Sequence, residues 1–107
     1  MKRLPVVLRE EAIADLVEIY DFIAEQSGLP EQALRFIARI RARCERIGDV
    51  PRGGRIRDDL VPGLRTVPFE RSAVIAYVVE EGTVRVTNIF YGGRDYEAFY
   101  GKGQAED

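Results

Sequence analysis

Residues 64–91 read LRTVPFERSAVIAYVVEEGTVRVTNIFY, and this stretch decides the fold. β-Branched and aromatic residues fill three segments, 64–69, 73–79 and 83–91, which are separated by short polar stretches. Alternation of apolar and polar residues within such segments is typical of strands that bury one face. The polar connections are short enough to form tight turns, which join antiparallel strands. The stretch therefore predicts an antiparallel meander of three strands.

Residues 10–47, nearer the N-terminus, have the periodicity of helices. Apolar side chains recur every three or four positions in two successive stretches, and this spacing places them on one face of a helix. The first stripe consists of Ile13, Leu16, Val17, Tyr20 and Ile23, and the second of Ala33, Ile37, Ile40, Cys44 and Ile47. Gly28 ends the first predicted helix and Pro30 begins the second, which Gly48 closes. So short a connection predicts an antiparallel helical hairpin.

The remaining segments complete an α+β domain of order β-α-α-β-β-β. Residues 5–8 are predicted as a short strand, and residues 51–62 as a loop in which residues 56–60 have the composition of a further short strand. A last helical turn is predicted at residues 95–100. We expect one domain over residues 1–100, in which the hairpin packs on one face of a mostly antiparallel sheet. Residues 101–107, which include Glu106 and Asp107, are predicted to be a flexible polar tail.

Composition excludes several kinds of chemistry. The chain has 107 residues with 46% hydrophobic and 32% charged residues, the balance of a globular protein. It contains no histidine and a single cysteine, Cys44, so we expect no disulfide, no metal site and no cofactor. No apolar run approaches the roughly 20 residues of a membrane helix, and no signal peptide is visible. A cytoplasmic protein that does not bind membranes is the expectation.

Arginine is the main source of positive charge, although the net charge is −2. A dedicated nucleic-acid reader is usually basic, so direct sequence-specific binding to nucleic acid is not expected. Four arginines share a face of the second predicted helix: Arg35, Arg39, Arg43 and Arg46. Three more flank the Gly53–Gly54 loop: Arg52, Arg55 and Arg57. Both groups are candidate surfaces for an antitoxin or another partner. For the helix arginines the alternative is a solvated helix face. Asp58 and Asp59, in the same loop, are expected only to solvate it.

The central predicted strand is apolar on both faces. Val74, Ala76 and Val78 alternate with Ile75, Tyr77 and Val79. A pair of helices covers only one face of a sheet, so we expect the other face to be partly exposed in a monomer. An exposed apolar face predicts a protein partner.

Several strings resemble toxins of the RelE/ParE superfamily, and of its ParE branch in particular. They are EEAIADLVEIYDFIAEQS (residues 10–27), VPGLRTVPFERSAVIAYVVEEGTVRVTNIFYGGRDYEAFY (residues 61–100) and, within the latter, GGRDYE (residues 92–97). The resemblance runs from Val6 to Tyr100. It implies the toxin of a type II toxin–antitoxin pair of the plasmid stabilisation type. It also implies that a ParD-like antitoxin neutralises the chain and that DNA gyrase is its target.

The sister branch resembles RelE, whose members cleave mRNA on the ribosome. Cleavage of RNA without a metal needs a general base, a general acid and cations around the phosphate. The middle strands carry only Arg65 and Arg71, and residues 73–79 contain no basic residue. Arg94 and Tyr100 match C-terminal positions of the RelE branch, but two such residues do not make a catalytic site. The sequence therefore favours a toxin that inhibits gyrase by binding and has no catalytic activity of its own. The alternatives are an mRNA endonuclease and a non-toxic relic that binds only the antitoxin.

The candidate residues for toxicity or target binding are Arg94, Asp95, Tyr96 and Tyr100. Arg94 would contact the target or, alternatively, pair with Asp95 or the sheet edge. The tyrosines would contact the target or close the core, and core packing is the favoured role of Tyr96.

Overall fold

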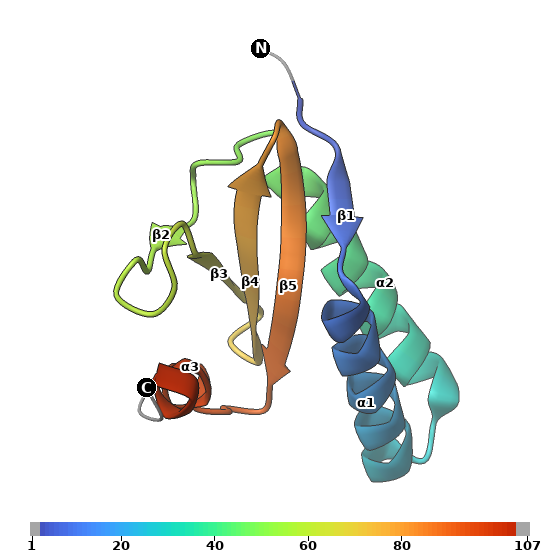
Figure 1. The fold of residues 1–107 in the computed structure, drawn as a ribbon. Coiled ribbons are helices and arrows are strands. Elements are labelled where there is room, and N and C mark those ends of the chain that lie inside the picture. Colours follow the sequence, from blue (N-terminus) through green and yellow to red (C-terminus); the bar gives the residue numbers. More distant parts are fainter. Residues whose placement is uncertain (1–2, 105–107) are drawn as a thin grey trace.

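A computed structural model describes residues 3–104, and their side chains as far as Gly101. The chain forms a five-stranded sheet with helices on both faces (Figure 1). The elements are β1 (Val6–Leu8), α1 (Glu10–Ser27), α2 (Pro30–Ile47), β2 (Arg55–Ile56), β3 (Arg65–Phe69), β4 (Ala73–Glu80), β5 (Thr83–Tyr91) and α3 (Tyr96–Gln104). The α+β class, the helical hairpin and the meander are confirmed.

The sheet has the order β1-β5-β4-β3-β2. β2 to β5 are antiparallel neighbours, as the short turns predict, whereas β1 lies parallel to β5 with Val6 opposite Val84. The parallel pairing arises because the α1–α2 hairpin separates β1 from the rest of the sheet in the sequence. The register between β4 and β5 shifts at Ala76 and Tyr77, where Thr87 is the extra residue of a β-bulge.

The main core lies between the helical hairpin and one face of the sheet. It is formed by the apolar stripes of both helices, with Leu16, Ile40 and Cys44 among their buried residues, and by inward-facing residues of β4 and β5. Ile75 and Tyr77 of β4 are fully buried there. The apolar residues that recur with helical spacing and those that alternate along the strands therefore pack together in one layer.

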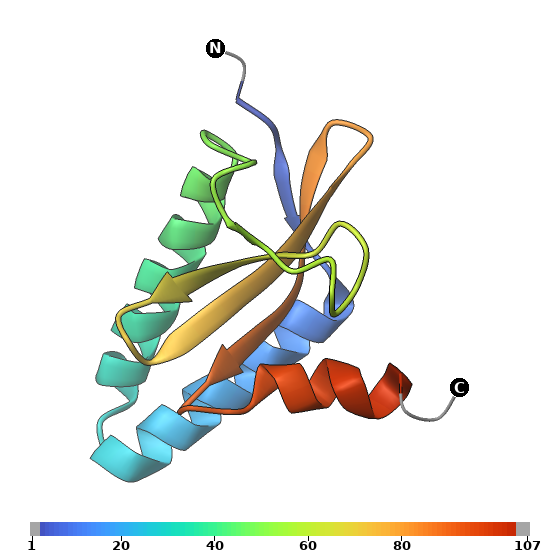
Figure 2. The same ribbon diagram turned by 90° about the vertical axis from the view of Figure 1, so that its left-hand side faces the viewer.

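The opposite face of the sheet is covered within the chain itself. α3 and the loop of residues 57–64 lie over it, on the other side of the sheet from α1 and α2 (Figure 2). Beneath them Ala76 is fully buried and Val74 and Val78 are half-buried. Val74 and Val78 thus keep the partial exposure predicted for this face, whereas the rest of it is covered by Tyr96 and Tyr100 of α3 and by the loop.

Two predicted segments differ in extent. β2 comprises Arg55–Ile56, whereas residues 57–60 belong to a turn rather than a strand. α3 continues to Gln104, into the stretch predicted as a tail. Residues 105–107 of that predicted tail, with Glu106 and Asp107, lie outside the described residues.

Gly48 is required for a reason that the sequence did not reveal. It follows the last residue of α2, as predicted, but with an ordinary right-handed conformation (φ −61°) that does not itself require glycine. A Cβ atom at this position would approach the carbonyl oxygen of Leu4 to 2.3 Å. The segment before β1 runs against the end of α2 here, and the Leu4 N–H donates to the Gly48 carbonyl (3.0 Å). None of the helices formed by residues 3–104 is long and apolar enough to cross a membrane.

Candidate functional site

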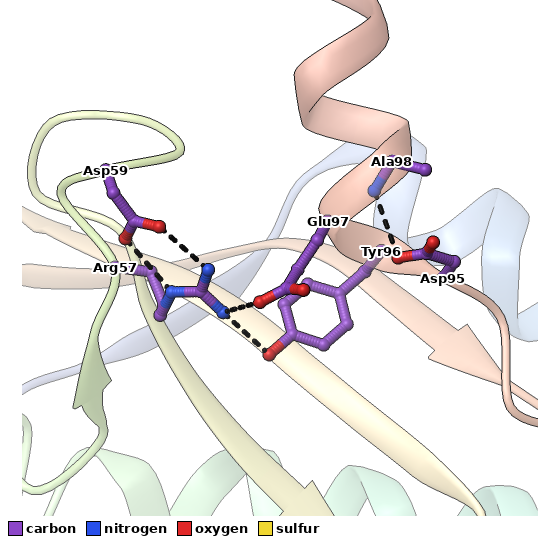
Figure 3. A network of polar contacts seen from close by, with 6 residues as sticks. All are labelled: Arg57, Asp59, Asp95, Tyr96, Glu97 and Ala98. Atoms are coloured by element: carbon purple, nitrogen blue, oxygen red, sulfur yellow. Dashed lines mark hydrogen bonds and ion pairs between the residues drawn. The ribbon is translucent and has the colours of Figure 1, made fainter.

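The C-terminal helix is attached to the sheet through Arg57. The Arg57 guanidinium donates two hydrogen bonds to the carboxylate of Asp59, at 3.0 and 2.8 Å. It also donates to the Tyr96 hydroxyl (3.1 Å) and forms an ion pair of 2.6 Å with Glu97 (Figure 3). These two residues belong to the first turn of α3. Arg57 therefore connects α3 to a loop that lies 39 positions earlier in the sequence.

Burial and pairing fix the charge of this network. The side chain of Arg57 is only 7% exposed, whereas those of Asp59 and Glu97 are 63% and 55% exposed. The hydrogen bond from Arg57 lowers the pKa of Asp59, and the reciprocal bond raises the pKa of Arg57. The prediction that Arg57 lies on a partner surface is wrong, since the N–H groups of its guanidinium already bond to Asp59, Tyr96 and Glu97 within the chain. Asp59 is likewise not merely a solvated loop residue.

Asp95 caps the start of α3. Its carboxylate accepts a hydrogen bond from the Ala98 N–H (3.1 Å), as drawn in Figure 3. This geometry satisfies one of the free N–H groups at the start of α3 and matches the negative charge to the positive end of the helix. The position of Asp95 is thus explained by local structure.

An aromatic cluster fixes the underside of α3. The Phe90 ring of β5 stacks on Tyr96 (centroids 5.6 Å apart) and meets the edges of Phe99 and Tyr100 at 5.4 and 5.9 Å. Phe90 is 3% exposed, and the two tyrosines are half-buried. Tyr96 thus packs on the smaller core, the role favoured from the sequence.

The two C-terminal tyrosines do not present free hydroxyls. The Tyr96 hydroxyl accepts the bond from Arg57. The Tyr100 hydroxyl is buried without a hydrogen-bond partner, and burial raises the pKa of this group. A phenol with a raised pKa that solvent cannot reach is a poor general base.

Arg94 is an exposed cation of the site. It lies between the Gly92–Gly93 turn and α3, and its guanidinium stands over the Phe90 ring at 5.6 Å from the centroid. It does not pair with Asp95, the alternative considered from the sequence. Arg94 and Arg71 line a hollow of about 190 Å³ at this end of the sheet. The sequence did not indicate Arg71 as a neighbour of Arg94, because 23 positions separate them and only the β4–β5 pairing brings their turns together.

The remaining predicted arginines occupy two other places. Arg52 and Arg55 are exposed on a loop that is fixed from beneath. Tyr77 donates to the Pro51 carbonyl (2.8 Å) and accepts from the Gly54 N–H (3.0 Å), while Arg65 donates to the carbonyls of Arg52 and Gly54. A Cβ atom on Gly54 would lie 2.5 Å from the Tyr77 hydroxyl, so only glycine fits there. The loop is therefore held in one conformation rather than being freely adaptable.

On α2 the arginines have different roles. Arg39 forms a bidentate pair with Glu70 (2.8 and 2.9 Å), which attaches α2 to the β3–β4 turn. Arg35 is exposed, and Arg43 is half-buried beside Arg46 at a hollow of about 440 Å³. Val50 and Gly53 line the same hollow. Arg43 thus joins the exposed loop arginines at one end of the molecule, away from α3.

Ligand chemistry at these sites is limited by the residues present. Within residues 3–104 no group of three or more His, Cys, Asp or Glu side chains could hold a metal ion. The cations at hand are guanidinium groups, which suit carboxylates and phosphates. Exposed guanidinium groups of this kind can bind anionic groups of a macromolecule.

The comparisons with known proteins agree with this fold. The family described as "ParE toxin of type II toxin-antitoxin system, parDE" matches residues 6–96. The chain belongs to this ParE toxin family. The match covers the hairpin, the meander and the Gly92–Tyr96 segment, and it confirms the resemblance seen in the sequence.

A solved structure supports the same assignment. A chain of the structure titled "Chromosomal ParDE TA system from P. aeruginosa" superposes with a TM-score of 0.73 and 26% sequence identity. The match covers 84% of this chain and 97% of the other. No curated protein matches the sequence. This ParE-family chain is therefore a toxin of a type II toxin–antitoxin system.

Proposed function

We propose that this toxin inhibits DNA gyrase by binding and that a ParD-like antitoxin neutralises it. The observation that supports binding over catalysis is the state of the C-terminal tyrosines. Tyr96 is engaged by Arg57, and the Tyr100 hydroxyl is buried under α3. An mRNA endonuclease needs groups that exchange protons with the RNA, whereas the Tyr100 hydroxyl does not reach solvent and the Tyr96 hydroxyl is bonded to Arg57.

The target surface in this proposal is centred on Arg94. Its neighbours Asp95 and Tyr96 position α3 and the 92–95 turn, and Arg94 is an exposed candidate whose side chain forms no hydrogen bond or ion pair in the described structure. A rigidly backed arginine at the end of a sheet is a typical binding hot spot. Asp95, Tyr96 and Tyr100 therefore act through the position of α3 rather than by direct contact.

The antitoxin surface in this proposal includes the basic end of the molecule. Arg52 and Arg55 of the loop and Arg43 of α2 form no hydrogen bond or ion pair through their side chains in the described structure. Acidic residues of an antitoxin would complement them. A gyrase inhibitor of this kind would act in the cytoplasm and, with its antitoxin, would stabilise the plasmid or locus that encodes the pair.

The test is a plasmid assay with the purified chain, DNA gyrase, ATP and relaxed or supercoiled plasmid. We expect loss of supercoiling or trapped double-strand breaks with the wild type, and a loss of at least about tenfold in potency with Arg94→Ala, the size of a moderate hot spot. The matched control is Arg41→Ala, which removes an exposed arginine of α2. Full potency of Arg94→Ala would disprove the assigned surface. A folded wild-type chain without effect on gyrase would disprove the target, and cleavage of ribosome-bound mRNA would then be assayed.

A further inference from the structure

A hollow at the end of the sheet contains two arginines and no carboxylate. It has a volume of about 190 Å³ and lies between the β3–β4 turn and the connection from β5 to α3. Its polar side chains are those of Arg71, Ser72 and Arg94, and none of the described residues that line it is acidic. The larger hollow beside α2, by contrast, contains Asp49 among its arginines. Guanidinium groups without a carboxylate beside them favour an anionic ligand.

The backbone fixes the two arginines next to each other. The Gly92 N–H donates to the Ser72 carbonyl (2.9 Å), so the end of β5 is bonded to the β3–β4 turn, and the two lie side by side (Figure 1). Arg71 precedes Ser72 by one position, and Arg94 follows Gly92 by two. Arg71 also has a left-handed backbone conformation (φ 58°), which is uncommon for a residue with a side chain. The tight turn therefore holds Arg71 in one direction.

The carboxylates adjacent in the sequence are bonded to other groups. Glu70 precedes Arg71 but forms its bidentate pair with Arg39 of α2. Asp95 follows Arg94 but caps the start of α3. Within the described part of the chain, the side chains of Arg71 and Arg94 form no hydrogen bond or ion pair. Two guanidinium groups that share a hollow repel each other, and a bound anion would offset this repulsion.

Arg94 also borders a second hollow, of about 260 Å³, which contains Asp15 and Glu18 of α1. Asp15 is already bonded to the backbone of β5, and no ion pair among the described residues joins Arg94 to Glu18. The Arg94 guanidinium lies over the ring of Phe90, which lines the hollow of Arg71 and not the hollow of Glu18. The positive charge of Arg94 is therefore on the side of Arg71.

The shape and the walls of the hollow favour a phosphodiester. A carboxylate accepts the two parallel bonds of one guanidinium, as Glu70 does from Arg39. A phosphate group presents its oxygens in a tetrahedral arrangement, so it can accept bonds from two guanidinium groups at once. Pro68, Val74 and Phe90 give the hollow an apolar wall, which suits the C–H groups of the sugars that flank a phosphodiester.

We propose that Arg71 and Arg94 together bind one phosphodiester of duplex DNA. The choice of DNA rests on the proposed function, since gyrase acts on duplex DNA, whereas the phosphate chemistry rests on the hollow itself. Two arginines that contact a phosphate do not read bases, so the binding is independent of sequence. The net charge of −2 predicts that the chain binds DNA weakly by itself. The toxin thus contacts the DNA in the gyrase complex in addition to the enzyme.

The experiment is fluorescence anisotropy of a short labelled DNA duplex with the purified chain, between about 50 and 200 mM salt. We expect weak binding whose logarithm falls with the logarithm of salt concentration with a slope of about −1, as for one neutralised phosphate. Arg71→Ala with Arg94→Ala should weaken binding by at least about tenfold. The charge-matched control is Arg52→Ala with Arg55→Ala, which removes two exposed arginines elsewhere and should bind like the wild type. Circular dichroism verifies that both variants are folded.

The single variants test whether both arginines hold the same phosphate. Each of Arg71→Ala and Arg94→Ala should lose most of the affinity, so the product of the two single losses should exceed the loss of the double variant. A product equal to the loss of the double variant would show two separate contacts and would overturn the shared site.

Three further results would overturn the inference. The first is a wild-type chain that does not bind the duplex at up to about 1 mM, well above the dissociation constants typical of non-specific binding. The second is an equal loss in the charge-matched control. The third is stronger binding to a single-stranded RNA of the same length, which would contradict the choice of DNA. The assay contains no gyrase, so a chain that binds the duplex through both arginines but leaves gyrase active would disprove only the gyrase proposal.

Discussion

The face of the sheet beneath α1 and α2 is covered mainly by aliphatic side chains, with the Phe36 ring among them, whereas the face beneath α3 is covered by aromatic rings and a network around Arg57. The first core contains long stripes of both helices and excludes solvent from residues such as Ile40 and Ile75. The second contains four buried residues, Leu60, Leu64, Ala76 and Phe90, and its cover is held by ion pairs with exposed carboxylates.

The two faces therefore differ in what they contribute to the stability of the domain and to the proposed target surface beside α3. Burial of apolar surface is the dominant favourable term in folding and does not require any group to be charged. The α3 side, by contrast, depends on groups that titrate and on charges that salt screens. The surface next to α3, which includes Arg94, can therefore loosen without unfolding the hairpin and the sheet.

The largest effect is expected from the aliphatic core. Ile40→Ala removes a fully buried side chain and should lower the free energy of unfolding by about 2–5 kcal/mol. Urea denaturation measures this change. The matched control is Ile56→Ala at a position 56% exposed, which should change stability by no more than about 0.5 kcal/mol. Equal losses for the two variants would show that the hairpin face does not carry the stability of the domain.

The thiol of Cys44 gives a second readout of the same core. Burial raises its pKa to about 11, so at neutral pH the folded protein keeps the thiol protonated and inaccessible. Alkylation should accelerate in Ile40→Ala and remain slow in variants that disturb only α3.

An intermediate, local effect is expected from the α3 network. Arg57→Ala removes the donors that hold Asp59, Tyr96 and Glu97, and should accelerate amide hydrogen exchange in α3 severalfold while the amides of α1 and α2 keep their protection. The matched control is Arg55→Ala, an exposed arginine two positions away. If exchange accelerated equally in α1 and α3, the two faces would not be separable.

The smallest effect is expected from acidification. Because Arg57 depresses the pKa of Asp59 in the folded state, this pair contributes stability above the ordinary aspartate value of 3.8 and loses it as the pH falls through the lower folded value. NMR spectra of the α3 amides between pH 7 and about pH 3 should therefore shift in the wild type and shift less in Asp59→Asn.

The equivalent pair on the other face is the control. Arg39 lowers the pKa of Glu70 in the same direction, so Glu70→Gln should reduce the acid sensitivity of global unfolding. It should leave the α3 titration unchanged. If the titration of the α3 amides changed in Glu70→Gln but not in Asp59→Asn, the acid-sensitive group would lie on the hairpin face and not beside α3.

Local sequence patterns were sufficient for the elements. The bounds predicted for the second helix (Pro30–Ile47) and for the last strand (Thr83–Tyr91) agree with the structure, because apolar periodicity and glycine or proline breaks act over a few residues. The family resemblance rests on the same strings. These patterns also placed Gly48 at the end of α2, but they did not reveal that the Leu4 carbonyl leaves room only for glycine there.

The sequence by itself determined the helices, the meander, the absence of histidine chemistry and the family of this chain, since each depends on residue type and near-neighbour spacing. Only the tertiary structure decided the roles of the candidate residues. It brought Arg57 to Tyr96 and Glu97, and placed Asp95 at a helix start. Arg94 remained exposed beside Arg71. Such roles depend on which segments, distant in the sequence, come into contact in the fold. The spacing of residues within one helix or strand carries no information about those contacts.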